Sequence, residues 1–184
     1  ANSGADIVCL REYAVGTSKN FLTNQKIANA LKMYRYRSII PIGTSGTLKF
    51  NIAVFSKYPI SKSRKIKYDS SLKEVGTCIP DSARQARAVA EEIKKIDTDY
   101  VLVCGDFNDT PISYAHRTIQ GPLKDAYAAS GRGVGVTYNE NFFWFKIDNI
   151  LHSANMKPIN CTVDKVRYSD HYPLWCYLQL KEND

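Results

Sequence analysis

Short apolar runs recur along the chain, and most have the length of a strand rather than of a helix. Residues 5–10 (ADIVCL) and 100–104 (YVLVC) are nearly continuous apolar runs, which predicts two buried strands. Five further segments have strand-like length and composition: residues 36–42, 49–56, 64–68, 146–152 and 173–180. Apolar and mixed positions alternate in the last of these, so one of its faces is expected to be more buried than the other.

Three segments are predicted to be helical. Residues 20–34 carry apolar side chains at helical intervals, which predicts an amphipathic helix. Ser82 and Gln85 match a capping box, so a second helix is expected to begin there and to end near Ile96. A threonine–proline pair at 110–111 predicts the start of a short third helix. Strands outnumber helices, and the helices fall between strands, so the fold class is α/β or α+β.

Length and composition indicate one folded domain over residues 1–184. Apolar residues make up 44% of the chain, which excludes a disordered protein. No apolar run approaches the roughly 18 residues of a membrane-spanning helix, so we expect no transmembrane segment, and we expect a soluble monomer. The chain begins at Ala1 rather than at a methionine, so an N-terminal targeting segment stays open and the compartment is not predicted.

The net charge favours an anionic partner. Lys and Arg number 25 against 18 Asp and Glu, a formal charge of +7. Nucleic acid, phospholipid head groups and phosphorylated small molecules all fit this charge. Basic residues gather in residues 57–67 and alternate with tyrosines in residues 34–37. A solvated basic surface is the alternative that this pattern leaves open.

The cysteines predict neither a zinc site nor a disulfide framework. They are Cys9, Cys78, Cys104, Cys161 and Cys176. Their number is odd, and no two lie within five residues of each other, which excludes the spacing of a zinc ribbon. Cys104 and Cys176 fall in strand-like runs, where a thiol behaves as a small apolar side chain. We therefore expect reduced, buried thiols.

Side chains that can carry chemistry stand at the ends of strand-like runs or within them. They are Glu12, Asp106 with Asn108, Asp148, and Asp170 with His171. Carboxylates, one carboxamide and one imidazole suit a hard cation such as Mg²⁺, and they also suit proton transfer at a phosphate. Taken singly, each could be a surface acid, a turn former or a helix cap. Their common position beside buried strands predicts a site.

Five segments together resemble the endonuclease/exonuclease/phosphatase superfamily, which includes DNase I-like nucleases, abasic-site endonucleases, neutral sphingomyelinases and inositol-polyphosphate phosphatases. They are DIVCLRE (6–12), NIAVFSKYPI (51–60), GDFNDTP (105–111), KIDNIL (146–151) and SDHYPL (169–174), in the order of the family. The resemblance implies a four-layered α/β/β/α sandwich of the DNase I-like kind, with the site at one edge of its two packed sheets.

The resemblance also implies catalytic roles. Asp106 matches the residue that activates or positions the attacking water, and Asn108 matches the one that contacts the scissile phosphate. His171 matches the histidine that stabilises charge on the phosphate or assists proton transfer, and Asp148 matches the aspartate that orients it. These roles predict in-line attack of water on phosphorus, in a phosphodiester or a phosphomonoester.

A divalent metal is part of the same implication, with one or two Mg²⁺ or Mn²⁺ ions as the cofactor. Glu12 matches the metal-binding glutamate, and Asp170 matches an acid near the metal. Arg11 departs from the glutamine common at its position. It adds a cation beside Glu12 that either contacts a substrate phosphate or crowds the metal.

Two segments of the family pattern are absent from this sequence. Family members begin with a strand that ends in asparagine, and they carry a strand ending in histidine before the helix that precedes GDFN. Here residues 70–81 alone separate the strand-like run 64–68 from the capped helix. His116 and His152 do not fill the missing role, and we expect both to be structural. Either the protein is a short form with impaired activity, or the sequence omits stretches of a longer chain.

Three functions stay open at this point. The substrate could be nucleic acid, which the charge favours, with the aromatic run 142–145 either flanking a pocket or packed as a strand. It could instead be a small or lipid head-group phosphate ester, on which the chain would act as a phosphatase or phosphodiesterase. Finally, the domain could be a non-catalytic anion-binding module that keeps the fold.

Overall fold

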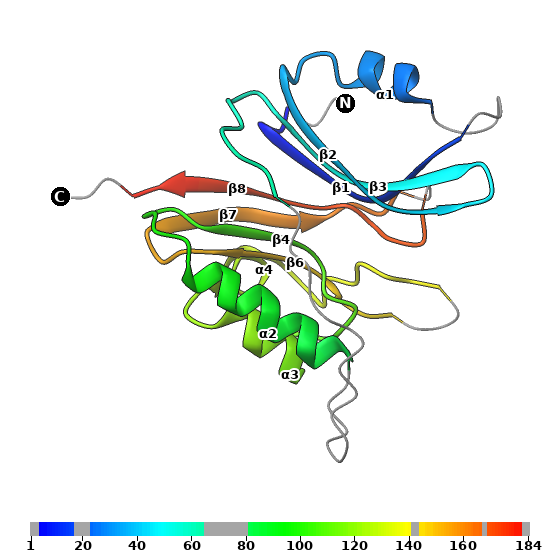
Figure 1. Cartoon of the computed structure of the whole chain (residues 1–184). Helices are drawn as coiled ribbons and strands as arrows, with labels where there is room; N and C mark the ends of the chain where they lie inside the picture. Colours follow the sequence, from blue (N-terminus) through cyan, green and yellow to red (C-terminus); the bar gives the residue numbers. More distant parts are fainter. Residues whose placement is uncertain (1–3, 17–22, 65–80, 141–143, 167–168, 182–184) are drawn as a thin grey trace. The chain divides into compact units, whose positions relative to one another are not determined.

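The structure is a computed structural model, and it describes residues 4–16, 23–64, 81–140, 144–166 and 169–181. The chain forms two compact units, Ala1–Lys65 and Ile66–Asp184. Each unit combines antiparallel strands with helices (Figure 1), so the predicted mixed α/β class is confirmed. Among the described residues, no helix is both long enough and apolar enough to cross a bilayer.

The N-terminal unit is a three-stranded antiparallel sheet with one helix. Its elements are β1 (Ile7–Val15), α1 (Asn24–Ala30), β2 (Tyr36–Ser45) and β3 (Leu48–Ser56), and the strand order is β1-β3-β2. The Thr23 hydroxyl accepts a hydrogen bond from the Lys26 amide and so caps α1 at its start. The core of this unit contains Ile27, Tyr34, Ala53 and Phe55.

Two details of this sheet differ from the sequence prediction. The strand predicted at residues 5–10 continues to Val15, because a bulge between Leu10 and Tyr13 lets the polar pair Arg11–Glu12 stay within β1. The turn predicted at residues 43–46 is shorter, since β2 runs to Ser45 and β3 begins at Leu48. Gly46 takes the left-handed conformation that this tight turn requires, with φ of 57°.

The described residues of the C-terminal unit form three helices and two sheets. Its elements are α2 (Asp81–Lys94), β4 (Leu102–Asp106), α3 (Tyr114–Gln120), β5 (Lys124–Asp125), α4 (Ala126–Ser130), β6 (Asp148–His152), β7 (Met156–Val163) and β8 (Leu174–Leu180). One sheet has the order β4-β6-β5, and the other pairs β7 with β8. The sequence prediction missed β5, α4 and β7.

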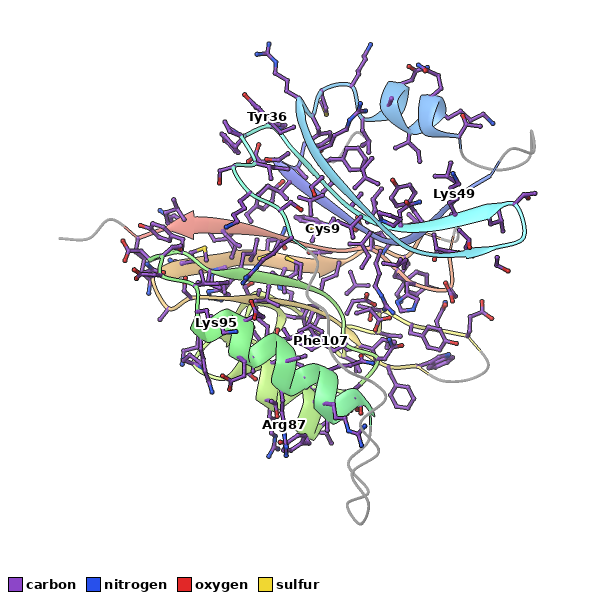
Figure 2. The ribbon with its side chains drawn as sticks, viewed as in Figure 1. Cys9, Tyr36, Lys49, Arg87, Lys95 and Phe107 are labelled. Atoms are coloured by element: carbon purple, nitrogen blue, oxygen red, sulfur yellow. The ribbon has the colours of Figure 1, made fainter. Side chains whose placement is uncertain are left out.

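Helices α2 and α3 cover one face of the β4–β6 sheet (Figure 1). Their shared core contains Ala86, Ala115, Ile119, Leu123 and Leu151. Arg87 of α2, labelled in Figure 2, points away from the sheet. Its guanidinium donates to the Tyr114 hydroxyl of α3 and also lies over the Tyr114 ring, so the two helices are joined at the surface as well. This packing fixes β4 and β6, the two strands that carry the candidate site.

The helix boundaries correct three predictions. Helix α2 begins at Asp81, so Ser82 lies inside it rather than at its cap. Helix α3 begins at Tyr114 rather than after Thr110, because the Ser113 hydroxyl accepts from the His116 amide and caps it there. Helix α1 covers Asn24–Ala30, less than the predicted residues 20–34, of which residues 20–22 lie outside the described residues. In the strand predicted at 64–68, Arg64 is irregular and the rest lies outside the described residues.

The exposure of the histidines and cysteines outside the candidate site can be compared with the sequence predictions. His116 and His152 are 1% and 2% exposed, as expected of structural side chains. The ring of Phe107, labelled in Figure 2, packs on the His116 ring. The described cysteines form no disulfide. Cys161 is buried and Cys176 is half-buried, but Cys9 and Cys104 are exposed, contrary to the prediction of buried thiols. Alternate side chains of β4 point away from the helix-covered face, and Cys104 is one of them. Cys78 lies outside the described residues.

Candidate active site

The register of the β4–β6 ladder sets two carboxylates side by side. Asp106, the last residue of β4, is the partner of Asp148, the first residue of β6. Side chains directly opposite each other in an antiparallel pair share one face, with Cβ atoms about 4.5–5.5 Å apart. Two like charges in such positions destabilise a sheet. Strand pairing alone gives no reason for this arrangement, whereas a site that uses two acids requires it.

His171 completes a cluster with these two acids. One ligand atom from each of Asp106, Asp148 and His171 lies within 4.8 Å of the others. The His171 Nδ1 atom is 2.7 Å from Asp148 Oδ2, and its Nε2 atom is 4.0 Å from Asp106 Oδ2. The three side chains are 5%, 23% and 28% exposed in the order Asp106, Asp148, His171. The C-terminal unit therefore brings together three of the predicted site residues at the end of one sheet.

The contact with Asp148 determines how the imidazole can act. With a proton on Nδ1, the ring donates to the Asp148 carboxylate, and this bond holds the ring orientation and stabilises positive charge on it. The other ring nitrogen, Nε2, then faces the side on which Asp106 lies. A distance of 4.0 Å between Nε2 and Asp106 Oδ2 is too long for a hydrogen bond, so Nε2 can serve a substrate oxygen.

Thr137 forms hydrogen bonds with the backbone at the start of β6, and no sequence pattern indicates this role. Its side chain is fully buried, and its hydroxyl oxygen accepts from the amides of Ile147 and Asp148 at 3.0 and 3.1 Å. Its carbonyl accepts from the Tyr172 amide at 2.7 Å. Thr137 thus links the start of β6 to the segment that carries His171. A threonine in a glycine-rich loop gives no sequence signal for such a role.

Tyr138 packs against His171 and was also missed. The two rings lie 5.1 Å apart between centroids at 57°, and the two residues form an isolated β-bridge. A second bridge joins Tyr138 to Phe145. The imidazole is therefore held by a hydrogen bond on one side and by an aromatic ring on another, which limits its rotation.

Asp106 and Asn108 form a tight turn after β4. The Asn108 amide donates to Asp106 Oδ1 at 2.6 Å, which fixes the orientation of this carboxylate. Asn108 has φ of 51°, in the left-handed region that non-glycine residues enter at a cost. The Asn108 side chain is exposed. Backbone strain of this kind persists where the surrounding structure imposes it, often beside functional groups.

Asp170, Arg11 and Glu12 are the remaining predicted residues. Asp170 is exposed, and its carboxylate accepts from the Ser169 hydroxyl at 3.0 Å. The Ser169 hydroxyl in turn accepts from the His171 amide, so Ser169 helps to shape the turn before His171. Arg11 and Glu12 belong to the N-terminal unit, at the bulge of β1. The roles of Arg11, Glu12 and Asp170 stay predictions.

The aromatic run beside the site is not a packed strand. Trp144 is 68% exposed and Phe145 is 43% exposed, which contradicts the packed reading for these two residues. Phe145 pairs with Tyr138 through an isolated bridge, and the backbone of Phe145 also accepts from the Thr137 amide. Residues 142–143 lie outside the described residues.

A cluster of buried charged and polar side chains lies at the start of β6. Lys146 is 7% exposed, and its ammonium group lies 3.2 Å from Asp125 Oδ2 and 2.5 Å from Asn149 Oδ1. Burial by itself raises the pKa of Asp125. The nearby His116 ring, 3.7 Å from Oδ2, and the charge of Lys146 outweigh burial and lower this pKa. Lys146 and Asn149 flank Asp148 in the chain, so the cluster anchors the start of β6.

Comparison with known protein families gives a match over most of the chain. The model of the Endonuclease/Exonuclease/phosphatase family matches residues 1–171. None of the curated proteins compared with the chain matches it significantly.

Several solved structures of that family share the fold. The endonuclease/exonuclease/phosphatase of Bacteroides vulgatus is 21% identical, with a TM-score of 0.72, and the match covers 96% of this chain and 85% of that one. A family protein of Leptotrichia buccalis is 15% identical, with a TM-score of 0.67 and coverage of 95% and 87%. The mannosyl-6-phosphatase Bt3783 of Bacteroides thetaiotaomicron is 16% identical, with a TM-score of 0.63 and coverage of 95% and 85%.

Proposed function

The chain belongs to the endonuclease/exonuclease/phosphatase family, and we propose that it hydrolyses phosphate esters by in-line attack of water on phosphorus with the help of a divalent metal. One observation carries the proposal: His171 is oriented by Asp148 and directs its Nε2 atom to the side of Asp106, all at the end of a single sheet. Membership in the family supports a phosphohydrolase activity. The geometry of Asp106, Asp148 and His171 supports the catalytic role proposed for each of these residues.

In the proposed reaction Asp106 accepts the proton of the attacking water. Its carboxylate is nearly buried, and the Asn108 amide holds it in place, so it has one orientation toward the site. His171, carrying a proton on each ring nitrogen, donates from Nε2 to a phosphate oxygen as negative charge develops there, and Asp148 stabilises this imidazolium through Nδ1. The bond from phosphorus to the ester oxygen breaks opposite the attacking water, and the alcohol leaves. Asn108 and Arg11 contact the phosphate. Arg11 is assigned from its place beside Glu12 in the sequence.

The donor set also fits a hard cation. Carboxylate oxygens are the ligands that Mg²⁺ and Mn²⁺ prefer. Asp148 Oδ2 and His171 Nδ1 are engaged with each other. Glu12 and Asp170 are assigned to the metal from the family resemblance alone. When bound, the ion offsets the charge of the phosphate and lowers the pKa of a bound water.

Several classes of phosphate ester fit the proposed reaction. A charge of +7 favours nucleic acid. The similar protein of Bacteroides thetaiotaomicron, named a mannosyl-6-phosphatase, supports a sugar phosphate monoester as the second candidate. Lipid head-group esters fit the same chemistry. A non-catalytic module is the remaining alternative, and it predicts no turnover of any of these substrates.

A substrate and metal screen tests the proposal. Plasmid DNA, an abasic oligonucleotide, bis-p-nitrophenyl phosphate and mannose 6-phosphate are each incubated with Mg²⁺, Mn²⁺ or EDTA. We expect turnover of at least one ester that EDTA abolishes. Asp106→Asn and His171→Ala should reduce the rate by orders of magnitude, while Asp97→Asn, an exposed acid outside the cluster, keeps it. Unchanged turnover in both site variants, or no turnover with any metal, would contradict the proposal.

A further inference from the structure

Cys161 of β7 and Cys176 of β8 form a pair of reactive groups outside the candidate active site. The two strands are antiparallel, and Thr162 is the partner of Trp175. The pairing is irregular between Ile159–Tyr177 and Thr162–Trp175, so that Asn160 and Cys161 together correspond to Cys176 on the other strand. Asn160 has a left-handed φ of 52° in this bulge. The two cysteines therefore lie on neighbouring strands within the same irregular step.

The two cysteines lie in one core cluster. Cys161 belongs to the cluster that contains Ala126 and Tyr127, Cys176 packs against it, and no disulfide joins them. The Cys176 thiol donates to the carbonyl oxygens of Ile159 and Tyr177. Opposite residues in an antiparallel pair have Cβ atoms about 4.5–5.5 Å apart, and a disulfide needs a Cβ separation of about 3.5–4.5 Å. Bonding the two sulfur atoms therefore requires the strands to close by the difference between these separations.

The two thiols differ in exposure and in acidity. Cys161 is 3% exposed, whereas Cys176 is half-buried. Contact with the Cys161 thiol lowers the pKa of Cys176 to about 7, and the same contact together with burial raises the pKa of Cys161. Cys176 is thus the accessible thiolate that attacks first, and Cys161 is the partner that resolves the intermediate.

We propose that Cys161 and Cys176 are a redox modification site, which a small-molecule disulfide of the glutathione class converts reversibly into an intramolecular disulfide. The Cys176 thiolate attacks one sulfur of the small disulfide, forming a mixed disulfide and releasing one thiolate. That thiolate takes up the proton of Cys161. The Cys161 sulfur then attacks the Cys176 sulfur and displaces the second small thiolate. Two protein thiols are oxidised, and one small disulfide is reduced to two thiols.

The position of this pair gives the modification a structural consequence. Residues 162–175 lie between the two cysteines and include His171. A Cys161–Cys176 bond closes this segment covalently at its base. Closing a loop restricts the unfolded chain more than the folded one, so the oxidised form is expected to be the more stable. The modification itself does not depend on the proposed phosphohydrolase activity.

Peptide mapping of the full chain tests the inference. The folded protein is incubated at pH 7.5 with oxidised glutathione, remaining thiols are blocked with iodoacetamide, and the chain is digested with trypsin. Cys161 falls in peptide 147–165 and Cys176 in peptide 168–181. We expect these two peptides to be linked, with a mass two hydrogens below their sum, and dithiothreitol to separate them. The oxidised protein should also melt at a higher temperature than the reduced one.

Cysteine variants test the order of attack. Cys161→Ser should accumulate a glutathione adduct at residue 176, and Cys176→Ser should leave Cys161 unmodified. Cys104→Ser is the matched control from the other sheet, and it should form the linked peptides as the wild type does. The inference is overturned if wild-type Cys161 and Cys176 are both alkylated, if a stable adduct stays on Cys176, or if Cys176 links to another cysteine. The wild-type measurement decides this even where a variant fails to fold.

Discussion

The Nδ1 atom of His171 and the Oδ2 atom of Asp148 lie 2.7 Å apart, which joins the start of β6 to the turn before β8. This bond crosses 23 positions of sequence and gives the imidazole a fixed orientation and an anionic partner. Both properties are needed if Nε2 is to donate to a phosphate during hydrolysis. The pair is therefore the point at which the proposed mechanism is most directly tested.

Asp148→Asn is expected to lower kcat by at least about a hundredfold with little change in KM. The amide keeps the shape of the side chain but removes the charge that stabilises the imidazolium, and it can orient the wrong tautomer of the ring. Initial rates over a range of substrate concentrations measure both constants. A kcat within threefold of the wild type would show that the pair is structural.

Thr137→Val should reduce both stability and activity, whereas Thr137→Ser should retain most of each. Valine has the shape of threonine but cannot accept from the Ile147 and Asp148 amides, and leaving a buried donor without a partner costs about 1–3 kcal/mol. Urea unfolding measures the stability, and steady-state rates measure the activity. Equal losses in the valine and serine variants would mean that packing, rather than the hydroxyl, matters here.

Lys146→Met is expected to destabilise the chain by about 3–5 kcal/mol, because it leaves the Asp125 carboxylate buried without its cation. Asp125→Asn combined with Lys146→Met should recover much of this loss, since the amide can still cap α4 through its oxygen. Chemical denaturation of the single and double variants measures the coupling. A double variant no more stable than the Lys146→Met protein would contradict the charge-pair interpretation.

The same carboxylate should contribute to acid sensitivity. The pKa of Asp125 is lower in the folded chain than its ordinary value, so its stabilising effect is complete above the unfolded pKa of about 4. The effect is lost as pH falls from that value toward the lowered folded pKa. Asp125→Asn should therefore show a shallower loss of stability than the wild type between about pH 5 and pH 2. Unfolding free energies measured across this range give the comparison, and parallel curves would contradict it.

Part of the site was accessible from sequence because strand ends are local features. Asp106 is predicted just after an apolar run, whereas Asp148 is predicted inside the strand-like run 146–152 and is found at the start of β6, where the ladder pairs it with Asp106. Thr137 contacts Asp148, and Lys146 pairs with Asp125, across separate segments of the chain. No local sequence pattern predicts these contacts. Chemical type and strand position could thus be predicted, but the supporting contacts could not.

Contacts between separate segments also explain why some predicted elements differ from the observed ones. The bulge in β1 allows the polar pair Arg11–Glu12 to continue a strand that a simple pattern would end at Leu10. Ser113 caps α3 in preference to Thr110 because its hydroxyl reaches the His116 amide, which sequence alone leaves undecided. The exposure of Cys104 follows from which face of β4 the helices cover.

The alternation of β6 makes catalysis a reporter of correct folding. A slip of one residue against β4 would turn Asp148 away from His171 and bring Asn149 to that side, because neighbouring side chains point to opposite faces. Such a molecule would keep its strands and much of its circular dichroism signal while losing turnover. Recovery of activity after dilution from urea therefore counts the molecules that reach the native strand alignment, which spectroscopic measures of secondary structure do not distinguish.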